Sequence, residues 1–491
     1  MRGALRIMGR IIGLEHEYGI MLPLPNGDFR VPHKYEIRAV INKYVLRNGG
    51  LCGRDERIWL ANGGCVYEDS GHPEYATPEC SSPEEAVLYS RAGDILMQEI
   101  FPNFLFHKNN LSSEYAVNPA TFGCHENYWT RFKKYDDEEQ KNRCYELLTP
   151  FLASRQIIDG AGWVDKSGEK FMISQRAGVL HYGQAGYRIL VSGTTMERPV
   201  FKSDDWITDG RYCRARLHFS AGDANILDFA LFLKISVTDL VLAMFEDGFM
   251  PDWICHDPQE AFGLISRDLT YKEKVMVLDG GKAVSALEAQ RFYCNSARKY
   301  LESEVRKNSL KYRKFKNTIR LWSRTLQALS KDDIGWLVGR VDHRTKRFLI
   351  ECDIKKSSDP IHRRKVDLQY HKINRYGLGA KVRRFYSKTQ MVSEEEAERA
   401  ARVYPSGSRA RIRGKIISGV LKNKEFACLR DFIGWNIDWW SVACVLGHDS
   451  ISGPKAETRW LYDPLETRVA LANNFLKRFK VFLKKIYGRL A

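Results

Sequence analysis

The sequence contains no two cysteines at the Cys-x-x-Cys spacing that structural zinc sites use, although 11 of its 491 residues are cysteine. These cysteines are scattered from Cys52 to Cys444, which gives no sign of a disulfide framework. Two Cys-His neighbours, at 124–125 and 255–256, have poor geometry for sharing one metal ion. We therefore expect reduced thiols in a cytoplasmic protein.

Long hydrophobic runs are also missing. The most apolar stretch, residues 226–245, is interrupted by Asp228, Lys234 and Asp239, so it predicts a core helix and not a membrane span. We expect no signal peptide, because the first residues lead directly into a strand-like motif. With 44% hydrophobic and 28% charged residues and no internal repeat, the composition is typical of a soluble protein with a large core.

Acidic residues are outnumbered, with 60 Asp and Glu against 77 Lys and Arg, which gives a net charge of +17. The basic residues concentrate at 298–316, at 340–365 and in the tail at 477–489. Such a surface can bind the phosphates of nucleic acid without specificity, or it can attract an acidic protein partner. It can also be no more than a solvated surface. Charge alone leaves these alternatives open.

The segment 62–79 has the most informative pattern in the chain. If the segment is extended, side chains two residues apart share a face, so Cys65, Tyr67 and Asp69 point in one direction. A turn at 70–71 is expected next, and Glu74 then adds a second carboxylate. Hard cations such as Mg²⁺ take oxygen ligands, and Mg²⁺ commonly accompanies a nucleotide phosphate. The segment therefore predicts a metal–nucleotide site.

Two further segments alternate in the same way. In 11–20, Glu15 and Glu17 share a strand face, and His16 points to the other face, where we expect it to pack. Along 214–223, one face is lined by Arg214, Arg216, His218 and Ser220. Arginine and histidine in this pattern suit phosphate oxygens. A plain antiparallel sheet with one solvated face is the alternative, but two acidic strands and one basic strand together favour a site.

These motifs resemble the Pup ligase/deamidase family, whose relatives include glutamine synthetase and the glutamate–cysteine ligases. The matching segments follow one another at 13–19, 62–80, 125–128, 149–156, 174–176, 216–225, 366–371, 411–414, Trp439 and 463–465. The resemblance implies an α+β fold, with a glutamine synthetase-like antiparallel sheet cradle and helices packed on one side. It also implies a catalytic domain at 1–407 and a small C-terminal domain at 408–491 that completes the nucleotide site.

The resemblance further implies roles for single residues, with Asp69 as the catalytic acid/base or nucleophile. The expected metal site and its surroundings comprise Glu15, Glu17, Tyr67, Glu74, Glu126 and His218. The expected contacts to nucleotide or phosphate are Thr77, Arg176, Arg198, Arg216 and Trp439. A surface ion pair is the alternative for each arginine. Cys65 departs from the family, which usually has an ATP-contacting arginine there, so either another arginine replaces it or nucleotide affinity is weaker.

The family makes or breaks an isopeptide bond between the C-terminal glutamate side chain of Pup, an acidic ubiquitin-like modifier, and a target lysine, using ATP and Mg²⁺. The resemblance therefore implies a Pup-like modifier and its lysine conjugates as partners, an indirect link to a bacterial proteasome, and no nucleic acid or membrane. The two-residue spacing between Asp69 and His72 favours the depupylase/deamidase branch over the Pup–protein ligase branch, whereas the short interval 19–62 argues against it. The alternative of another class is a catalytically inactive basic binding protein, for which Cys65 is the only sign.

The periodicity predicts helices at 82–100, 136–148, 226–246, much of 284–333, and 393–403. The second of these should stop before Pro150, because proline disfavours helix in the residue ahead of it. Residues 405–408 read as a linker. A basic amphipathic helix is expected at 473–487, packed on its own domain.

Overall fold

The computed structural model describes residues 10–48, 51–52, 57–111, 122–132, 138–177, 213–305, 309–354, 359–422 and 477. Arg198, Trp439 and, apart from residue 477, the expected tail helix lie outside the described residues. Of the expected C-terminal domain, the main described part is α14 (Ala410–Lys422). The domain boundary at 407 therefore stays a prediction.

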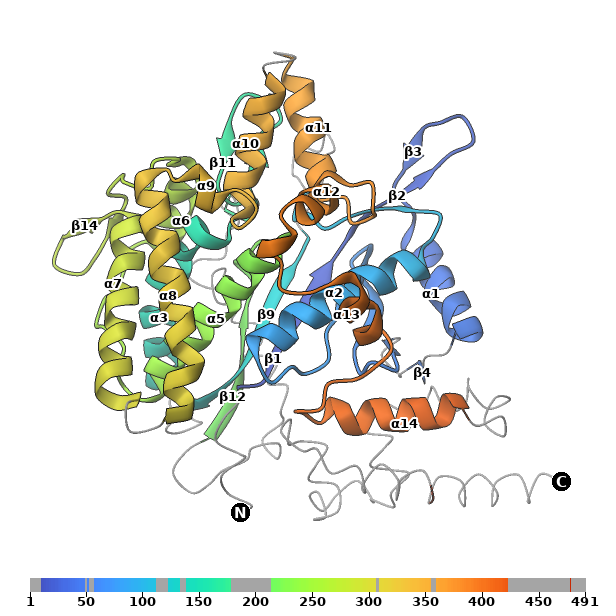
Figure 1. The fold of residues 1–491 in the computed structure, drawn as a ribbon, viewed down its shortest axis with the longest axis horizontal. Coiled ribbons are helices and arrows are strands. Elements are labelled where there is room, and N and C mark those ends of the chain that lie inside the picture. The colour runs from blue at the N-terminus through green and yellow to red at the C-terminus, as the bar shows by residue number, and fades with distance from the viewer. Residues whose placement is uncertain are drawn as a thin grey trace.

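A seven-stranded antiparallel sheet forms the centre of the fold (Figure 1). Its strands in spatial order are β12 (Cys213–Phe219), β9 (Cys124–Phe132), β1 (Ile12–Glu17), β7 (His72–Ala76), β6 (Cys65–Asp69), β5 (Ile58–Trp59) and β4 (Leu51–Cys52). A smaller sheet consists of β3 (Phe29–Arg30), β2 (Gly19–Pro23) and β8 (Leu105–His107). Two short hairpins pair β10 (Trp163–Val164) with β11 (Phe171–Met172) and β13 (Met276–Val277) with β14 (Ala283–Val284).

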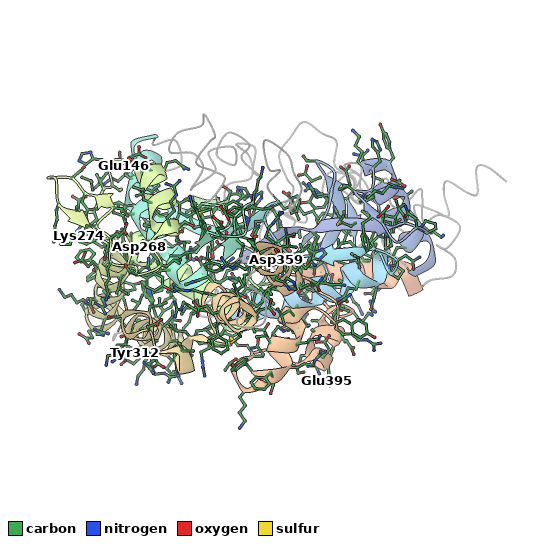
Figure 2. The ribbon with its side chains drawn as sticks, turned by 90° about the horizontal axis from the view of Figure 1, so that it is seen from above. Glu146, Asp268, Lys274, Tyr312, Asp359 and Glu395 are labelled. Atoms are coloured by element: carbon green, nitrogen blue, oxygen red, sulfur yellow. The ribbon has the colours of Figure 1, made fainter. Side chains whose placement is uncertain are left out.

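Helices pack against one face of the large sheet. The helices that contact its strands are α1 (Lys34–Asn48), α2 (Pro83–Ile100) and α5 (Asp228–Glu246). The other helices are α3 (Glu138–Asp159), α6 (Pro258–Arg267), α7 (Ala286–Tyr300), α8 (Ser309–Lys331), α9 (Ile334–Leu337), α10 (Asp342–Ile354), α11 (Pro360–Tyr370), α12 (Leu378–Phe385) and α13 (Glu394–Ala400). Seen from above, α8 with Tyr312 and α13 with Glu395 lie along the same side of the molecule (Figure 2).

The alternation expected for the first strand is present in β1. Leu14 and His16 are buried toward the helices, while Glu15 and Glu17 are half-buried on the other face. His16 Nε2 lies 3.0 Å from the hydroxyl of Ser90 on α2, which confirms that this histidine packs away from the carboxylates. The predicted α+β class, an antiparallel sheet with helices on one side, is confirmed.

Several helices begin where the sequence predicts. Ser82 is the N-cap of α2 and its hydroxyl accepts a hydrogen bond from the Glu85 N–H, with Pro83 in the first turn. Ser393 starts α13 with a reciprocal capping box to Glu396. Each cap satisfies N–H groups that have no partner within the helix.

Helix α3 continues through Pro150, so the predicted end before that residue is wrong. Proline has no N–H to donate to the carbonyl four residues earlier, which here belongs to Glu146. The hydroxyl of Thr149 donates to this carbonyl at 3.3 Å, and it thereby satisfies the acceptor that Pro150 leaves open. Burial of Phe151 and Leu152 in the core holds the following turn in helical form.

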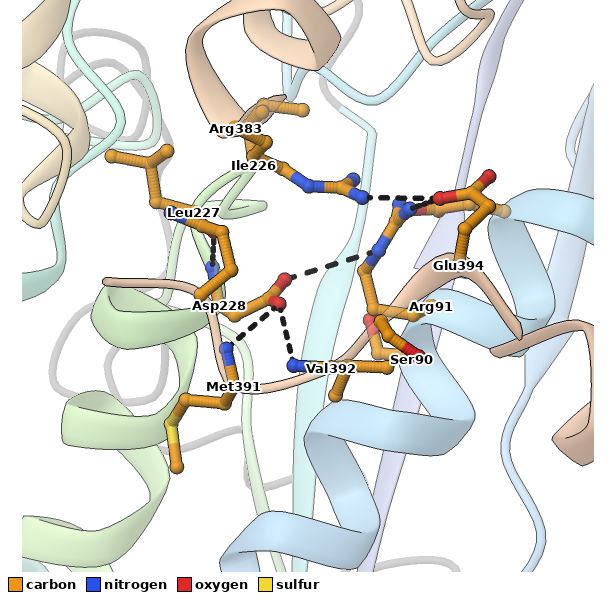
Figure 3. Close-up of polar contacts among 12 residues, drawn as sticks. Ser90, Arg91, Ile226, Leu227, Asp228, Arg383, Met391, Val392 and Glu394 are labelled. Atoms are coloured by element: carbon orange, nitrogen blue, oxygen red, sulfur yellow. Dashed lines mark hydrogen bonds and ion pairs between the residues drawn. The ribbon is translucent and has the colours of Figure 1, made fainter. Parts of the chain in front are cut away.

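An ion network joins the helices on the covered side of the sheet (Figure 3). Arg91 of α2 lies 3.8 Å from Asp228 at the start of α5 and 3.3 Å from Glu394 of α13. Arg383 of α12 lies 3.6 Å from the same Glu394. The second oxygen of Asp228 accepts hydrogen bonds from the backbone N–H groups of residues 391 and 392. The network therefore ties α2 and α5 to α12 and α13, which lie far from them in sequence.

No helix in the described part of the chain is long and apolar enough to cross a membrane. Helix α5 is the most apolar, but Lys234 and Asp239 are buried within it and have polar partners. Lys234 donates to the carbonyl of Asp223 at 2.7 Å, and Asp239 pairs with Arg10 at 2.9 Å. The expectation of a core helix at this position is confirmed.

Candidate active site

The face of the large sheet opposite the helices carries the polar residues that the sequence singles out. In the pairing of β1 with β7, Glu17 lies opposite Glu74. In the pairing of β1 with β9, Glu15 lies opposite His125. Because paired residues on neighbouring antiparallel strands point to the same side, these side chains converge from three strands.

Three carboxylates, Glu17, Asp69 and Glu74, form what we call the acidic cluster. Each contributes an oxygen, and these oxygens lie within 4.8 Å of one another. The hairpin from β6 to β7 makes this possible, because its two turn residues, Ser70 (φ 52°) and Gly71 (φ 93°), have the backbone of a type I′ turn. Asp69 is exposed at the end of β6, whereas Glu74 is buried.

Glu15 lies beside this cluster and is surrounded by donors from two further strands. One carboxylate oxygen lies 3.2 Å from His125 Nδ1 and 3.6 Å from His218 Nε2. The other accepts a hydrogen bond from Asn127 at 3.1 Å. Burial alone would raise the pKa of Glu15, but hydrogen bonds from the two histidines outweigh burial and hold this pKa well below its usual value.

Tyr67 connects the acidic cluster to the wall of a cavity. Its hydroxyl donates a short hydrogen bond to Glu74. Burial and the nearby charge of Glu74 raise the pKa of Tyr67 well above 10. Burial and the charge of Glu15 raise the pKa of Glu74 well above its usual value. Among the described residues, several carboxylates thus lie close together at this site, which favours an added cation.

A cavity of about 200 Å³ lies on the same face, next to Glu15 and Tyr67. Its lining residues are Ile11, Gly13, Leu14, Glu15, Arg57, Trp59, Cys65, Tyr67, Ala76, Thr77, Glu79, Asn127, Tyr128, Trp129, Arg409 and Arg413. Thr77 is fixed in this wall by two contacts with Leu14. Its hydroxyl accepts from the Leu14 N–H at 3.0 Å, and its own N–H donates to the Leu14 carbonyl at 2.9 Å.

Helix α14 closes one end of the cavity through a buried ion cluster. Arg409 and Arg413 both pair with Glu79, with Arg409 Nε 2.8 Å from the carboxylate. Arg413 also donates to the carbonyl of Gly63 at 2.9 Å, and its guanidinium lies 4.6 Å from the centre of the Trp59 ring. Residues more than 300 positions apart in sequence therefore meet at this wall.

The structure brings most of the predicted site residues to one face of the sheet. Those in or beside the acidic cluster and the surroundings of Glu15 are Glu15, Glu17, Tyr67, Asp69, Glu74 and His218. Thr77 lines the adjoining cavity. Arg216 belongs to β12, and its backbone lies opposite that of Trp129 in β9. Arg198 and Trp439 lie outside the described residues, so their placement stays a prediction.

The structure contradicts the placement of Glu126 in the metal site. Glu126 is fully buried on the helix side of β9, where it accepts hydrogen bonds from Arg155 at 2.6 Å and from Tyr128 at 2.7 Å. The neighbouring residue His125 points to the site instead and contacts Glu15. The alternation of β9 could have indicated this, because Cys124 and Tyr128 are buried with Glu126 while His125 has the opposite parity.

Arg176 is buried near the acidic cluster. Its guanidinium donates to the carbonyls of Ser220 at 3.1 Å and Phe122 at 3.0 Å. Burial lowers the pKa of Arg176, and the nearby charge of Glu17 partly opposes this change. The side chain is thus held by backbone carbonyls close to the carboxylates, and a simple surface ion pair does not describe it.

The donor set fits a hard divalent cation. Carboxylate oxygens from Glu17, Asp69 and Glu74 form the candidate group with hard ligands. Glu15 with His125 and His218 forms a second candidate group, in which the two imidazole nitrogens suit transition metals better than a hard cation. The side chains of the two candidate groups come close to each other at Gly123. A Cβ at this position would lie 2.6 Å from a Glu17 oxygen and 2.7 Å from His125 Nε2. The absence of a side chain at this position thus lets ligands of both groups approach each other.

Comparisons of this sequence with known proteins all indicate the same family. Residues 10–442 match the sequence profile of the Pup-ligase protein family. The chain is 31% identical to the Pup–protein ligase of Jonesia denitrificans over 452 residues, covering 88% of this chain and 91% of that one. It is 33% identical to the Pup–protein ligase of Geodermatophilus obscurus over 457 residues, covering 88% and 92%.

Two solved structures have the same fold. One is the complex between the prokaryotic ubiquitin-like protein Pup and its ligase PafA, with a TM-score of 0.75 and 23% identity over 99% of this chain and 97% of that chain. The other is the Pup ligase PafA in complex with ADP, with a TM-score of 0.68 and 24% identity over 92% and 95%. The expected carboxylate–amine ligase fold is confirmed. From its sequence and its fold, the chain belongs to the Pup ligase family.

Proposed function

We propose that this protein is an ATP- and Mg²⁺-dependent ligase. It joins the side-chain carboxylate of a C-terminal glutamate, on an acidic Pup-like modifier, to the amine of a target lysine. The observation that carries the proposal is the acidic cluster beside a cavity on one face of the sheet. The curated relatives named above as Pup–protein ligases, at 31% and 33% identity, support the same reaction.

Mg²⁺ would neutralise phosphate charge and align the phosphoryl group for transfer. We assign its binding to Glu15, Glu17 and Glu74, with His218 and the hydroxyl of Tyr67 beside them. The raised pKa of Glu74 supports this assignment, because crowded carboxylates that keep a proton without a cation can give it up when a cation arrives. Arg176 and Arg216 are proposed to bind phosphate or the glutamyl group.

The reaction needs an activated carboxylate, since a carboxylate itself does not react with an amine. A glutamate oxygen attacks the γ-phosphorus of ATP, the bond from that phosphorus to the β–γ bridging oxygen breaks, and ADP leaves. The lysine amine then attacks the glutamyl carbonyl carbon, and phosphate leaves with the oxygen that came from glutamate. We assign to Asp69, which is exposed at the end of β6, the role of accepting the proton that the amine loses.

The ligase direction is favoured over the depupylase/deamidase direction. The relatives compared above are named ligases, which supports the alternative that the sequence motifs ranked second. The spacing from Asp69 to His72 is weak evidence for the depupylase branch. The two residues between them, Ser70 and Gly71, form the turn of a tight hairpin. Turn length reports how the hairpin closes, and it does not set the direction of the reaction.

The remaining expectations belong to the same proposal. The C-terminal domain at 408–491 completes the nucleotide site, with Trp439 packed on the adenine ring and Arg198 near phosphate. A cytoplasmic location and an indirect link to a bacterial proteasome fit a protein that conjugates a Pup-like modifier. The inactive binding protein is disfavoured, because Glu15, Asp69, Glu74 and His218 are all present and lie on one face.

The direct test is to run both directions with one preparation. The enzyme, ATP and Mg²⁺ are incubated with a purified modifier ending in Gly-Gly-Glu and a lysine-bearing protein, and separately with the finished conjugate. The proposal predicts conjugate and ADP in equal amounts in the first reaction. Cleavage of the conjugate without conjugation would support the depupylase instead. No reaction in either direction, with the modifier still bound, would support the inactive binding protein.

A further inference from the structure

The charges around the cavity are distributed unevenly. Among the described lining residues the cations are Arg57, Arg409 and Arg413, and the carboxylates are Glu15 and Glu79. Arg409 and Arg413 lie at the α14 end, where Glu79 pairs with both. Arg57 is therefore the described lining cation at the end of the cavity that holds Glu15 and the hydroxyl of Tyr67.

The position of Arg57 follows from the strand register. Ile58 of β5 pairs with Val66 of β6, and Trp59 pairs with Cys65, so one step further back places Arg57 opposite Tyr67. In agreement, the guanidinium carbon of Arg57 lies 4.8 Å from the centre of the Tyr67 ring. Arg57 is exposed and lines the cavity, so its guanidinium lies over the tyrosine ring at the rim of the cavity.

Among the described lining residues, no other positive charge lies on the wall beside Arg57. Cys65, which the register places opposite Trp59 on this wall, is 4% exposed and has a short, uncharged side chain. Beyond it, Tyr67 leads to Glu74 of the acidic cluster. Of the described residues, a polyphosphate entering this end of the cavity would meet carboxylates on one side and the guanidinium of Arg57 on the other.

We propose that Arg57, reaching over Tyr67 from the neighbouring strand, is the arginine that binds the nucleotide phosphates in this cavity. The inference rests on the proposed use of the cavity for ATP. It answers the question raised by Cys65: a different arginine, eight positions earlier in the chain, supplies the charge to the same wall. A guanidinium suits this place because its N–H groups match phosphate oxygens in pairs.

Three variants separate the charge of Arg57 from its packing. Arg57→Met keeps a stem against Tyr67 but removes the charge, and Arg57→Lys keeps the charge. Arg30→Met is the matched control, because Arg30 is an exposed arginine on β3 that pairs with Glu36 outside the cavity. Calorimetry measures the dissociation constant for ATP in the presence of Mg²⁺, and competition of adenosine with ATP measures the constant for adenosine. Thermal unfolding confirms that each variant is folded.

We expect Arg57→Met to raise the dissociation constant for ATP about tenfold to a hundredfold, the usual effect of losing a hydrogen bond to a charged group. Arg57→Lys should lose less affinity than Arg57→Met, because it keeps the charge, but it should still bind more weakly than wild type, because it lacks the paired N–H groups. Arg30→Met should bind as wild type does. Adenosine affinity should be the same in all variants. An unchanged ATP constant in Arg57→Met would overturn the inference, and so would equal losses for ATP and adenosine. Failure of the wild type to bind ATP would instead overturn the proposed function itself.

Discussion

At the scale of single residues, Glu15 and Glu74 show how the surroundings of a carboxyl group can shift its pKa in opposite directions. Glu15 receives hydrogen bonds from His125 and Asn127 and lies 3.6 Å from His218 Nε2. Its pKa is well below the usual value despite burial. Glu74 is buried against the charge of Glu15, and its pKa is raised. One carboxylate is held ionised and the other tends to keep its proton, which is consistent with a site that binds a cation.

Replacing Asp69 tests which residue carries the chemistry. Asp69→Asn keeps the size of the side chain, and its oxygen can still accept the 2.9 Å hydrogen bond from the Ser70 hydroxyl. The amide cannot accept a proton at neutral pH or attack as a carboxylate. We expect turnover to fall about 100-fold or more, with ATP affinity measured by calorimetry unchanged. If Asp69 only stabilises the turn, the Asn variant would instead turn over at nearly the wild-type rate.

Gly123 offers a test of the space between the two ligand groups. In Gly123→Ala the new Cβ would meet the ends of the Glu17 and His125 side chains, which can both move aside. We expect the midpoint of thermal unfolding to change by only a few degrees, because flexible side chains yield at small cost. Activity at limiting Mg²⁺ should fall about tenfold or more, since ligand displacement weakens the site.

The control for Gly123→Ala is the Mg²⁺ dependence itself. High Mg²⁺ should restore part of the activity if the ligands have moved but remain present. A variant with wild-type Mg²⁺ dependence would show that this close approach has no role in the site.

Residue parity explains where sequence reasoning succeeded and where it failed. Glu15 and Glu17 were assigned to one face because they are two apart, and the structure agrees. On β9 the resemblance implied a role for Glu126 in the metal site, but only one of two adjacent residues can face the site, and His125 is the one that contacts Glu15. The buried partner Arg155, which neutralises Glu126, is 29 positions away. No local pattern could have identified that pair.

At the scale of elements, the hairpin of β6 and β7 sets the positions of Asp69 and Glu74. Gly71 has φ 93° and no atom within 4 Å of an added Cβ, so its role is conformational. Gly248, just after α5, has φ 72° and equally open surroundings, but it lies far along the chain from the site. The two glycines therefore form a matched pair.

We expect Gly71→Ala and Gly248→Ala to destabilise the protein equally, by about 1 kcal/mol, because each forces a side chain into the left-handed region. Only Gly71→Ala should also lower turnover, since it disturbs the hairpin that carries Asp69. Chemical denaturation and a turnover assay on both variants provide the measurement. Equal activity in the two variants would mean that the hairpin tolerates a changed turn without moving its carboxylates.

The docking of α14 on the cavity wall predicts an acid-sensitive contact. Burial would raise the pKa of Glu79, but Arg413 and Arg409 lower it from 4.5 to about 2. A carboxyl whose folded pKa is lowered contributes stability that is fully present above the unfolded value and is lost as pH falls toward the folded value. At about 1.4 kcal/mol per pKa unit, the contribution is on the order of 3 kcal/mol.

The measurement is the free energy of unfolding against pH for the wild type and for Glu79→Gln. The difference between the two proteins should be constant above pH 5, because Glu79 is ionised there in both states. It should shrink as pH falls from 4.5 toward 2. A difference that does not change with pH would show that the ion cluster contributes nothing that depends on the charge of Glu79.

The elements also show what local sequence can and cannot predict. Caps at Ser82 and Ser393 are decided by neighbouring residues, and helices were predicted to begin at both positions. The passage of α3 through Pro150 depends on one side-chain hydrogen bond from Thr149 and on core packing. A rule about proline alone could not weigh these contributions, because tertiary packing overrides local propensity.

At the scale of the whole molecule, the net charge of +17 fits association with an acidic modifier. A net charge of this size speeds the association of oppositely charged proteins, but it does not determine the fold. The order of strands in the large sheet places β9 beside β1, although the paired residues of these two strands are more than 100 positions apart in sequence. Periodicity can predict each strand, but it cannot predict these neighbours. Here the resemblance of whole motifs in order supplied the arrangement that single strands could not.

The central claim is that ATP activates the glutamate carboxylate of the modifier on this sheet. It is tested most directly by labelling both oxygens of that carboxylate with ¹⁸O and analysing the phosphate released during conjugation by mass spectrometry. If the carboxylate attacks the γ-phosphorus, each conjugate formed leaves one phosphate that carries one ¹⁸O atom. Conjugate formed with unlabelled phosphate, or phosphate released only by hydrolysis of ATP by water, would contradict the account.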